Sequence, residues 1–422
     1  MPPIPAACQS IADRIEALEQ ELDALQRDLA GLDRPKDEPG PGPGEKGQIG
    51  RQINKLRAEI RDAKRDLAAC TERNTPPPSP DTRPDLRVRY VEVNQSVQTG
   101  GAANRIRLIR NRSTVVRVFV VSGVDNGFDA GAGRNRWPGV TGDLEVIDPA
   151  TGSSGAALQP VNPGGVVTAM PLRELDTENL GHSLNYRLPL SSVSTPSIEL
   201  RARIWVRGHY GEGGGWSAES STTVELRDRR PQEVTPILLI DTVGGAPPPT
   251  MATFVRVLRR GALARLPVPF FSVNPPITLP VTQDLTSVLG WAGMLSGLAT
   301  INFIGRRSGG IRCGLLPFNG AYPVSGMGIP RIGFTAPAFA SVPDEDTFAH
   351  EMGHTHGLDH ALCTGAEPWP HDSRLPGRTN ATGLHIEDML IRRRGTGELM
   401  GYCPNPTWPS IETYDHVYDN PA

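Results

Sequence analysis

Residues 350–360 read His-Glu-Met-Gly-His-Thr-His-Gly-Leu-Asp-His, and this stretch decides the interpretation of the C-terminal part of the chain. Four of the nine histidines of the protein fall within it. Residues four apart in a helix project from the same face, so His350 and His354 can offer imidazole nitrogens to one zinc ion. Chance would produce such a pattern in only on the order of a few windows per million at ordinary residue frequencies. The stretch therefore predicts a zinc-binding helix.

The remaining parts of a catalytic zinc site follow from the same spacing. Glu351 lies at the next radial position, where its carboxylate is poorly placed to ligate zinc but can hold an attacking water and take its proton. Gly357 can adopt the positive φ that ends a helix sharply, which would bring His360 back to the metal as the third ligand. Acidic residues at 344–346 suit the start of the helix. A fourth position would stay open for water.

At these residues the sequence resembles the metzincin clan of zinc metalloendopeptidases, and the preceding β domain and residues 408–418 resemble those of bacterial secreted metzincin-like proteins. The positions that match the clan's long zinc motif are His350, Glu351, His354, Gly357 and His360. The resemblance covers roughly residues 236–422, and its specific part is the zinc motif with a Met-turn. It implies an α+β metzincin-like catalytic domain, one catalytic Zn²⁺ and a protein or peptide substrate.

The clan's second hallmark is a methionine-containing turn beneath the metal. Met400, in the segment Glu-Leu-Met-Gly-Tyr at 398–402, follows the third histidine and would form a hydrophobic floor under the ligands; its alternative is an ordinary core residue. In astacin-like and serralysin-like members, a tyrosine two residues after that methionine ligates zinc or stabilises the oxyanion. Tyr402 occupies the matching place, the alternative being a buried tyrosine bonded to the backbone. The resemblance also places Cys363 and Cys403 near the metal and favours a disulfide between them, which leaves Cys313 unpaired.

Other residues near the motif are expected to play lesser parts. His356 is expected to lie behind the ligands or to face solvent. His371 and His385 could border the pocket, but a surface position is favoured for each. By analogy with the clan, residues 333–337 are expected to form the edge strand along which an extended substrate lies.

Two further regions are defined by their periodicity. Alternation with a period of two over residues 86–229 predicts an all-β, immunoglobulin-like sandwich that serves as a rigid spacer or a binding module. Its strands are expected at residues 86–97, 115–121, 142–147, 198–206 and 221–226. In the catalytic region, residues 230–422, strands alternate with helices. These elements are expected as strands at 237–240, near 270, at 314–317 and at 332–334, and as helices at 251–266 and from 285.

Residues 1–74 contain two heptad seams, which predict an antiparallel coiled-coil hairpin. The seam residues are Ile11, Ile15, Leu18, Leu22, Leu25, Leu29 and Leu32 in the first helix, and Ile49, Ile53, Leu56, Ile60, Ala63 and Leu67 in the second. They keep one antiparallel register, in which Cys8 and Cys70 lie opposite each other and can form a disulfide. A Pro/Gly-rich turn over 35–47 separates the helices, and 75–85 is a stiff Pro-rich linker. The hairpin is expected to be a spacer or self-association element, or else a docking arm or pro-segment.

Composition restricts the class of partner and the compartment. The chain of 422 residues has 43 Lys and Arg against 46 Asp and Glu, a net charge of −3, which gives no general electrostatic case for nucleic acid or an anionic membrane. The uncharged stretch 285–305 is interpreted as a buried amphipathic helix rather than a membrane span. Two disulfides indicate an oxidising compartment and hence a secreted protein, although residues 1–7 do not resemble a signal peptide.

The sequence therefore predicts a zinc endopeptidase in which Glu351 is the general base. Two alternatives remain. One is a binding or adhesion protein that uses the β-sandwich and carries a latent or vestigial zinc site. The other is a zinc hydrolase that acts on a non-protein amide, since the same ligand set activates water against either bond.

Overall fold

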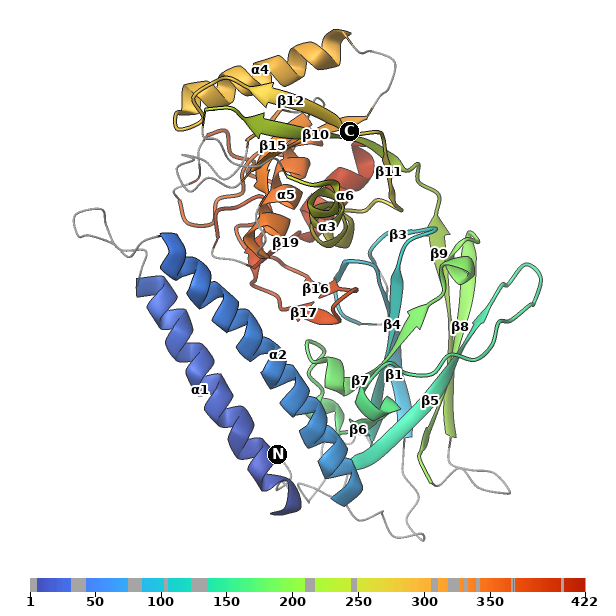
Figure 1. Cartoon of the computed structure of the whole chain (residues 1–422). Coiled ribbons are helices and arrows are strands. Elements are labelled where there is room, and N and C mark those ends of the chain that lie inside the picture. The colour runs from blue at the N-terminus through green and yellow to red at the C-terminus, as the bar shows by residue number, and fades with distance from the viewer. Residues whose placement is uncertain are drawn as a thin grey trace.

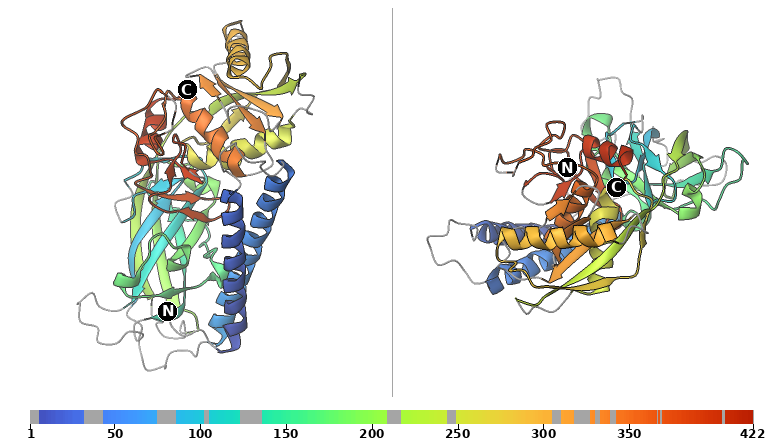
Figure 2. Two further views of the ribbon diagram at one scale, coloured as in Figure 1. Left: turned by 90° about the vertical axis from the view of Figure 1, so that its left-hand side faces the viewer. Right: turned by 90° about the horizontal axis from the view of Figure 1, so that it is seen from above.

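The structure is a computed structural model, and it describes residues 6–31, 43–74, 86–101, 105–122, 136–208, 217–243, 249–304, 310–317, 327–329, 333–338, 342–365, 367, 369–403 and 406–421. A pair of long helices lies along one side of a β-rich body, and an α+β region covers one end of that body (Figure 1). The views in Figure 2 show the helix pair beside the body from two further directions. No helix among the described residues is long and apolar enough to cross a membrane.

The N-terminal helices form the predicted antiparallel hairpin. They are η1 (Ala6–Cys8), α1 (Gln9–Gly31) and α2 (Pro43–Asn74). The buried seam residues are Ile15, Ile53, Leu56, Ile60 and Ala63. Cys8 and Cys70 form the expected disulfide, with 5.8 Å between their Cα atoms. The turn was predicted to extend to Gly47, but α2 already begins at Pro43, because the first turn of a helix tolerates a residue without an N–H donor. Leu32, most of the predicted turn and the predicted linker 75–85 lie outside the described residues.

The β-rich body consists of two sheets that share one apolar core. The first sheet has the order β1 (Leu86–Asn94), β4 (Thr114–Ser122), β7 (Ser183–Leu188). The second has the order β3 (Leu108–Ile109), β9 (Ser217–Arg227), β8 (Ser197–Val206), β5 (Trp137–Ile147), β6 (Val167–Ala169). Short helical turns lie at η2 (Pro163–Gly165), η3 (Leu172–Glu174), η4 (Leu180–His182) and η5 (Leu190–Val193). The sequence did not predict β7, because its buried positions include the polar Ser183 and Asn185. The finer immunoglobulin-like assignment stays a prediction.

The α+β region is built on a mixed sheet. Its order is β11 (Phe271–Val273), β10 (Gln232–Asp241), β13 (Ile311–Pro317), β15 (Gly333–Ala338), β14 (Met327–Ile329), and β12 (Ile277–Val281) also pairs with β10. All these pairs are parallel except β14 with β15. The expectation that residues 333–337 form an edge strand was wrong, because β15 lies between β13 and β14. Among the described strands, β14 ends the sheet on that side.

Helices cover both faces of this sheet. On one face lie α3 (Met251–Val257), the π-helical η6 (Leu258–Leu263) and α5 (Val342–Thr355), and on the other lies α4 (Val288–Ile304). Side chains of β10 alternate between the two cores, with Val234 facing α5 and Ile237 facing α4. The helix expected over 251–266 is present as α3 and η6, continuous through residue 265 with π-helical hydrogen bonding over η6. The uncharged stretch forms α4, which covers the sheet with its buried Trp291.

The β-rich body and the α+β region are joined by a shared sheet. β2 (Val97–Gln98) pairs with β16 (Thr382–His385), which pairs with β17 (Leu390–Arg392). The buried Arg112 strengthens this connection, because its guanidinium donates hydrogen bonds across the boundary. The acceptors across the boundary are the carbonyl oxygens of Leu263, Leu266 and Val268, and that of Gln95 accepts within the β-rich body. The chain ends with β18 (Gly397–Glu398), β19 (Thr407–Trp408) and α6 (Ile411–Asp419).

Candidate metal centre

Helix α5 presents two of the three predicted metal ligands. His350 and His354 lie one turn apart on it, and their ring centroids are 4.8 Å apart. The His360 ring lies 5.4 Å from that of His350 and 4.7 Å from that of His354. Each histidine offers one possible ligand nitrogen, and these three atoms all lie within 4.8 Å of one another. The structure therefore brings the three predicted ligands together as a group that could hold a metal ion.

Backbone carbonyls select the tautomer of two of these histidines. His350 Nδ1 lies 2.8 Å from the Leu399 carbonyl oxygen, and His354 Nδ1 lies 2.7 Å from that of Leu358. A carbonyl oxygen only accepts hydrogen bonds, so each Nδ1 must carry the hydrogen and donate it. The lone pair of each neutral ring is then on Nε2, the atom left to bind a metal.

Burial keeps these rings neutral. Loss of solvent lowers the pKa of His350 well below its ordinary value, and the neighbouring His354 adds to this effect. Burial likewise lowers the pKa of His354 to about 4. Neutral imidazole is the form that ligates metals, so proton competition at these two rings is weak near neutral pH.

Glu351 is buried beside the ligands. Its side chain is 5% exposed, and burial raises its pKa well above the ordinary range. Its Oε2 atom is buried with no hydrogen-bond partner among the residues that the structure describes. A buried carboxylate oxygen without a partner is costly, which indicates that this position is suited to a cation or to a bound water.

A glycine turn returns the chain to the cluster after α5. Gly357 has φ +83°, as predicted from its place in the motif. The backbone of His360 is then held on both sides, because its N–H donates to Pro370 O at 3.3 Å and its carbonyl accepts from Asp372 N at 2.9 Å. The third ligand is thus fixed by backbone hydrogen bonds rather than by a helix.

Met400 lies directly against α5. It is fully buried, and a Cβ atom added to Gly353 would come within 2.4 Å of its sulfur. Its carbonyl oxygen accepts a hydrogen bond from Ala361 N at 3.0 Å, which connects it to the segment that carries the third ligand. The sequence did not identify Gly353, although a glycine inside a helix is unfavourable unless something requires close approach.

Tyr402 lies at the open side of the cluster. Its ring is 5.2 Å from that of His360 and 5.9 Å from that of His350, and half of the residue is exposed. Burial of the other half raises its pKa, and the charges of Glu351 and Glu367 raise it further, so the hydroxyl stays neutral and can donate. The expected alternative of a buried tyrosine does not match this exposure.

A disulfide and a buried carboxylate fix the segment around Met400. Cys363 and Cys403 are paired as expected, with 5.5 Å between their Cα atoms, while Cys313 is buried without a disulfide. Glu398 is fully buried and accepts hydrogen bonds from the backbone of Met400 and from the backbone and side chains of the segment that begins α6. Its donors are Met400 N, Ser410 N, Ser410 Oγ and Thr413 Oγ1. Sequence spacing gave no signal for Glu398.

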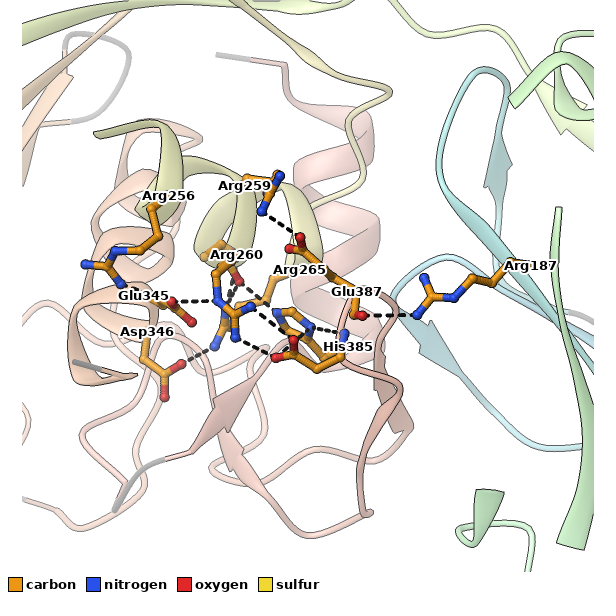
Figure 3. Close-up of polar contacts among 11 residues, drawn as sticks. Arg187, Arg256, Arg259, Arg260, Arg265, Glu345, Asp346, His385 and Glu387 are labelled. Carbon is orange, nitrogen blue, oxygen red and sulfur yellow. Dashed lines mark hydrogen bonds and ion pairs between the residues drawn. The ribbon is translucent and has the colours of Figure 1, made fainter. Parts of the chain in front are cut away.

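Arginines hold the first turn of α5 (Figure 3). Arg260 donates to Glu345 at 2.9 Å, and its other nitrogens bind Asp388. Arg265, which is 1% exposed, pairs with the buried Asp346. Because these arginines belong to η6 and the residues after it, the helix that presents the histidines is fixed to its neighbour by charge.

Three other histidines near the motif are not part of the three-histidine group, although the backbone of His371 bridges to that of His360. His356 is 4% exposed, so the solvent-facing alternative was wrong; its Nδ1 bonds to Asn420 O at 2.8 Å. His385 was expected at the surface but is 2% exposed, because β16 packs it against Trp408 and beside Asp388. His371 is exposed, as favoured.

Comparison with known proteins gives no assignment. No family model and no curated protein matches the chain. Among solved structures, it is similar to one titled "Structure of a chaperone-substrate complex", with a TM-score of 0.27 and 10% identity. The alignment covers 47% of this chain and 38% of that chain. A likeness at this TM-score identifies neither fold nor function.

Proposed function

We propose that this protein is a zinc-dependent endopeptidase that hydrolyses peptide bonds of protein substrates. The observation that carries the proposal is the convergence of His350, His354 and His360 beside the buried carboxylate of Glu351. The tautomers of His350 and His354 leave the Nε2 lone pair of each ring available to a metal. Three histidine side chains with a fourth position left for water are a donor set that catalytic zinc accepts. The resemblance of residues 350–360 and 398–402 to the metzincin motifs supports the same assignment.

The chain's own residues have distinct parts in the proposed reaction. A bound zinc ion would supply Lewis acidity, which polarises the scissile carbonyl and makes water a nucleophile near neutral pH. Glu351 takes the proton of the attacking water and returns it to the leaving amine, for which a carboxyl with a raised pKa is suited. Tyr402 donates a hydrogen bond to the developing oxyanion.

The proposal includes the compartment and the way in which substrate binds. Two disulfides, Cys8–Cys70 and Cys363–Cys403, are consistent with an extracellular protein, and we propose that it is secreted. An extended peptide would add to the terminal strand β14, in place of the interior residues 333–337. The hairpin of α1 and α2 is proposed as a spacer or a self-association element.

The first experiment measures metal content and cleavage together. Elemental analysis is expected to find one zinc per chain, and a mixed peptide library is expected to be cleaved in a manner that a chelator abolishes and added zinc restores. Zinc without cleavage would favour the binding or adhesion alternative. Cleavage of non-peptide amides alone would favour the alternative hydrolase.

Replacement of the proposed base separates metal binding from catalysis. Glu351→Gln keeps the volume of the side chain but cannot accept a proton, so kcat should fall by about 10²- to 10⁴-fold while zinc content stays at one per chain. Glu225→Gln, an exposed position on β9, is the matched control and should not change kcat. Unchanged turnover in Glu351→Gln would refute the mechanism.

A further inference from the structure

The loop that follows the third histidine is folded around one carboxylate. Glu367 Oε1 accepts hydrogen bonds from the backbone N–H groups of Cys363 at 2.9 Å and Thr364 at 2.8 Å. Its Oε2 accepts from Gly365 N at 2.8 Å. The side chain is 5% exposed although it lies in a surface loop. Nothing in the sequence pattern identifies this residue.

The same carboxylate reaches the segment after Met400. Glu367 Oε1 also accepts from the backbone N–H of Tyr402, at 3.3 Å. One residue further, Cys403 is bonded to Cys363, so both ends of the disulfide adjoin atoms that Glu367 holds. A single side chain therefore connects the loop of the third ligand to the backbone of the tyrosine.

The charge of Glu367 is suited to this role. Burial by itself raises its pKa, but the backbone hydrogen bonds from Thr364, Cys363 and Tyr402 outweigh this effect and lower the pKa to about 2. Hydrogen bonds to an ionised acceptor are stronger than those between neutral groups. The anchor thus stays charged at any pH at which the enzyme would work.

Tyr402 is weakly constrained by side-chain packing. The ring lies 5.2 Å from that of His360, yet half of the residue faces solvent. The direction of its side chain is therefore set by its backbone, which is held by Glu367 at the residue's own N–H and by the disulfide at the next residue.

We propose that Glu367 is a positioning residue that holds Tyr402 against the three-histidine cluster during hydrolysis. The inference deepens the proposed function and rests on it. Glu367 itself does not contact the reacting atoms. It acts through the main chain of Tyr402, so its loss should remove the contribution of the tyrosine and little else.

A double-mutant cycle of Glu367→Gln and Tyr402→Phe tests this role. Loss of a single oxyanion donor lowers kcat by about 10²- to 10³-fold, and a misplacement of about 1 Å can cost about 10²-fold. We expect Glu367→Gln to lower kcat by about 10²-fold with little change in KM. In the Tyr402→Phe background the same substitution should lower kcat by less than about 3-fold, because the affected donor is already absent. Equal losses in both backgrounds would overturn the proposal.

A second readout requires neither metal nor activity. In the metal-free protein, amide hydrogen exchange at Cys363, Thr364, Gly365 and Tyr402 should accelerate in Glu367→Gln. Glu412→Gln is the matched control, since its carboxylate accepts hydrogen bonds from the side chain of Asn380, and it should leave exchange at these amides unchanged. Unchanged exchange in Glu367→Gln would also overturn the proposal.

The outcomes separate this inference from the proposed function. A wild-type protein that cleaves no peptide refutes the endopeptidase and, with it, the part of Glu367 in hydrolysis. A wild-type protein that cleaves peptides, with additive losses in the cycle, refutes only the part of Glu367. If Glu367→Gln folds poorly, Glu367→Asp retains the charge but is one methylene shorter, and it should give the same non-additive loss.

Discussion

The contact between Gly353 and Met400 gives a quantitative prediction. Gly353→Ala places a Cβ 2.4 Å from the Met400 sulfur, so the methionine must move. Overpacking of this kind costs about 1 to 3 kcal/mol, whereas alanine in place of glycine inside a helix gains about 1 kcal/mol. The free energy of unfolding should therefore fall by about 0 to 2 kcal/mol. In a Met400→Ala background the steric cost is absent, and Gly353→Ala should stabilise by about 1 kcal/mol.

The assay is denaturant unfolding of the metal-free protein, followed by near-ultraviolet circular dichroism. The expected coupling energy between the two positions is about 1 to 3 kcal/mol. Gly297→Ala in α4 is the matched control, because a Cβ there meets nothing within 4 Å, and it should stabilise by about 1 kcal/mol. Equal destabilisation by Gly353→Ala with and without Met400 would refute the argument that this methionine requires the glycine.

Two further predictions concern buried charge and pH. Arg112→Met should lower the free energy of unfolding by about 3 kcal/mol, since it removes charged donors from buried carbonyls. The control is Arg110→Met, at an arginine paired with the exposed Asp228, which should cost under about 1 kcal/mol. Similar losses in the two variants would contradict this prediction. Burial lowers the pKa of His385 to about 4. The unfolded chain therefore binds the extra proton between about pH 6.5 and 4, and stability falls as pH decreases through that window by up to about 1.4 kcal/mol per unit. His385→Gln should remove this part of the slope, and an unchanged slope in metal-free unfolding would contradict the assignment.

The features that the sequence predicted correctly are those set by local periodicity. His350 and His354 lie on one face of α5 because they are one helical turn apart, and Gly357 has the positive φ that its place after the helix required. The hairpin seam and the Cys8–Cys70 disulfide follow from heptad spacing in the same way. Each of these relations depends only on the distance along the chain.

Features that depend on contacts between distant segments could not be predicted in this way. Glu367 accepts hydrogen bonds chiefly from backbone N–H groups, which every residue type except proline carries, so no partner residue marks it in the sequence. Glu398 accepts from Ser410 and Thr413, which lie more than ten residues away in the chain. The pairing of β2 with β16 joins segments almost 300 residues apart. The position of β15 inside its sheet likewise depends on the strand order, which the alternation of apolar residues does not encode.

The segment between Met400 and α6 connects the β-rich body to the candidate site. Thr407 N donates to Asp346, near the start of α5, and Leu399 N donates to the Trp408 carbonyl oxygen, which joins this segment to the residues around Met400. The Trp408 indole N–H donates to Ser96 O, and Ser96 Oγ donates to the carbonyl oxygen of Arg265, the partner of Asp346. Every one of these groups is buried. A shift of the loop at Ser96 would therefore break hydrogen bonds that fix α5 relative to Met400, so the β-rich body supports the geometry of the histidine cluster.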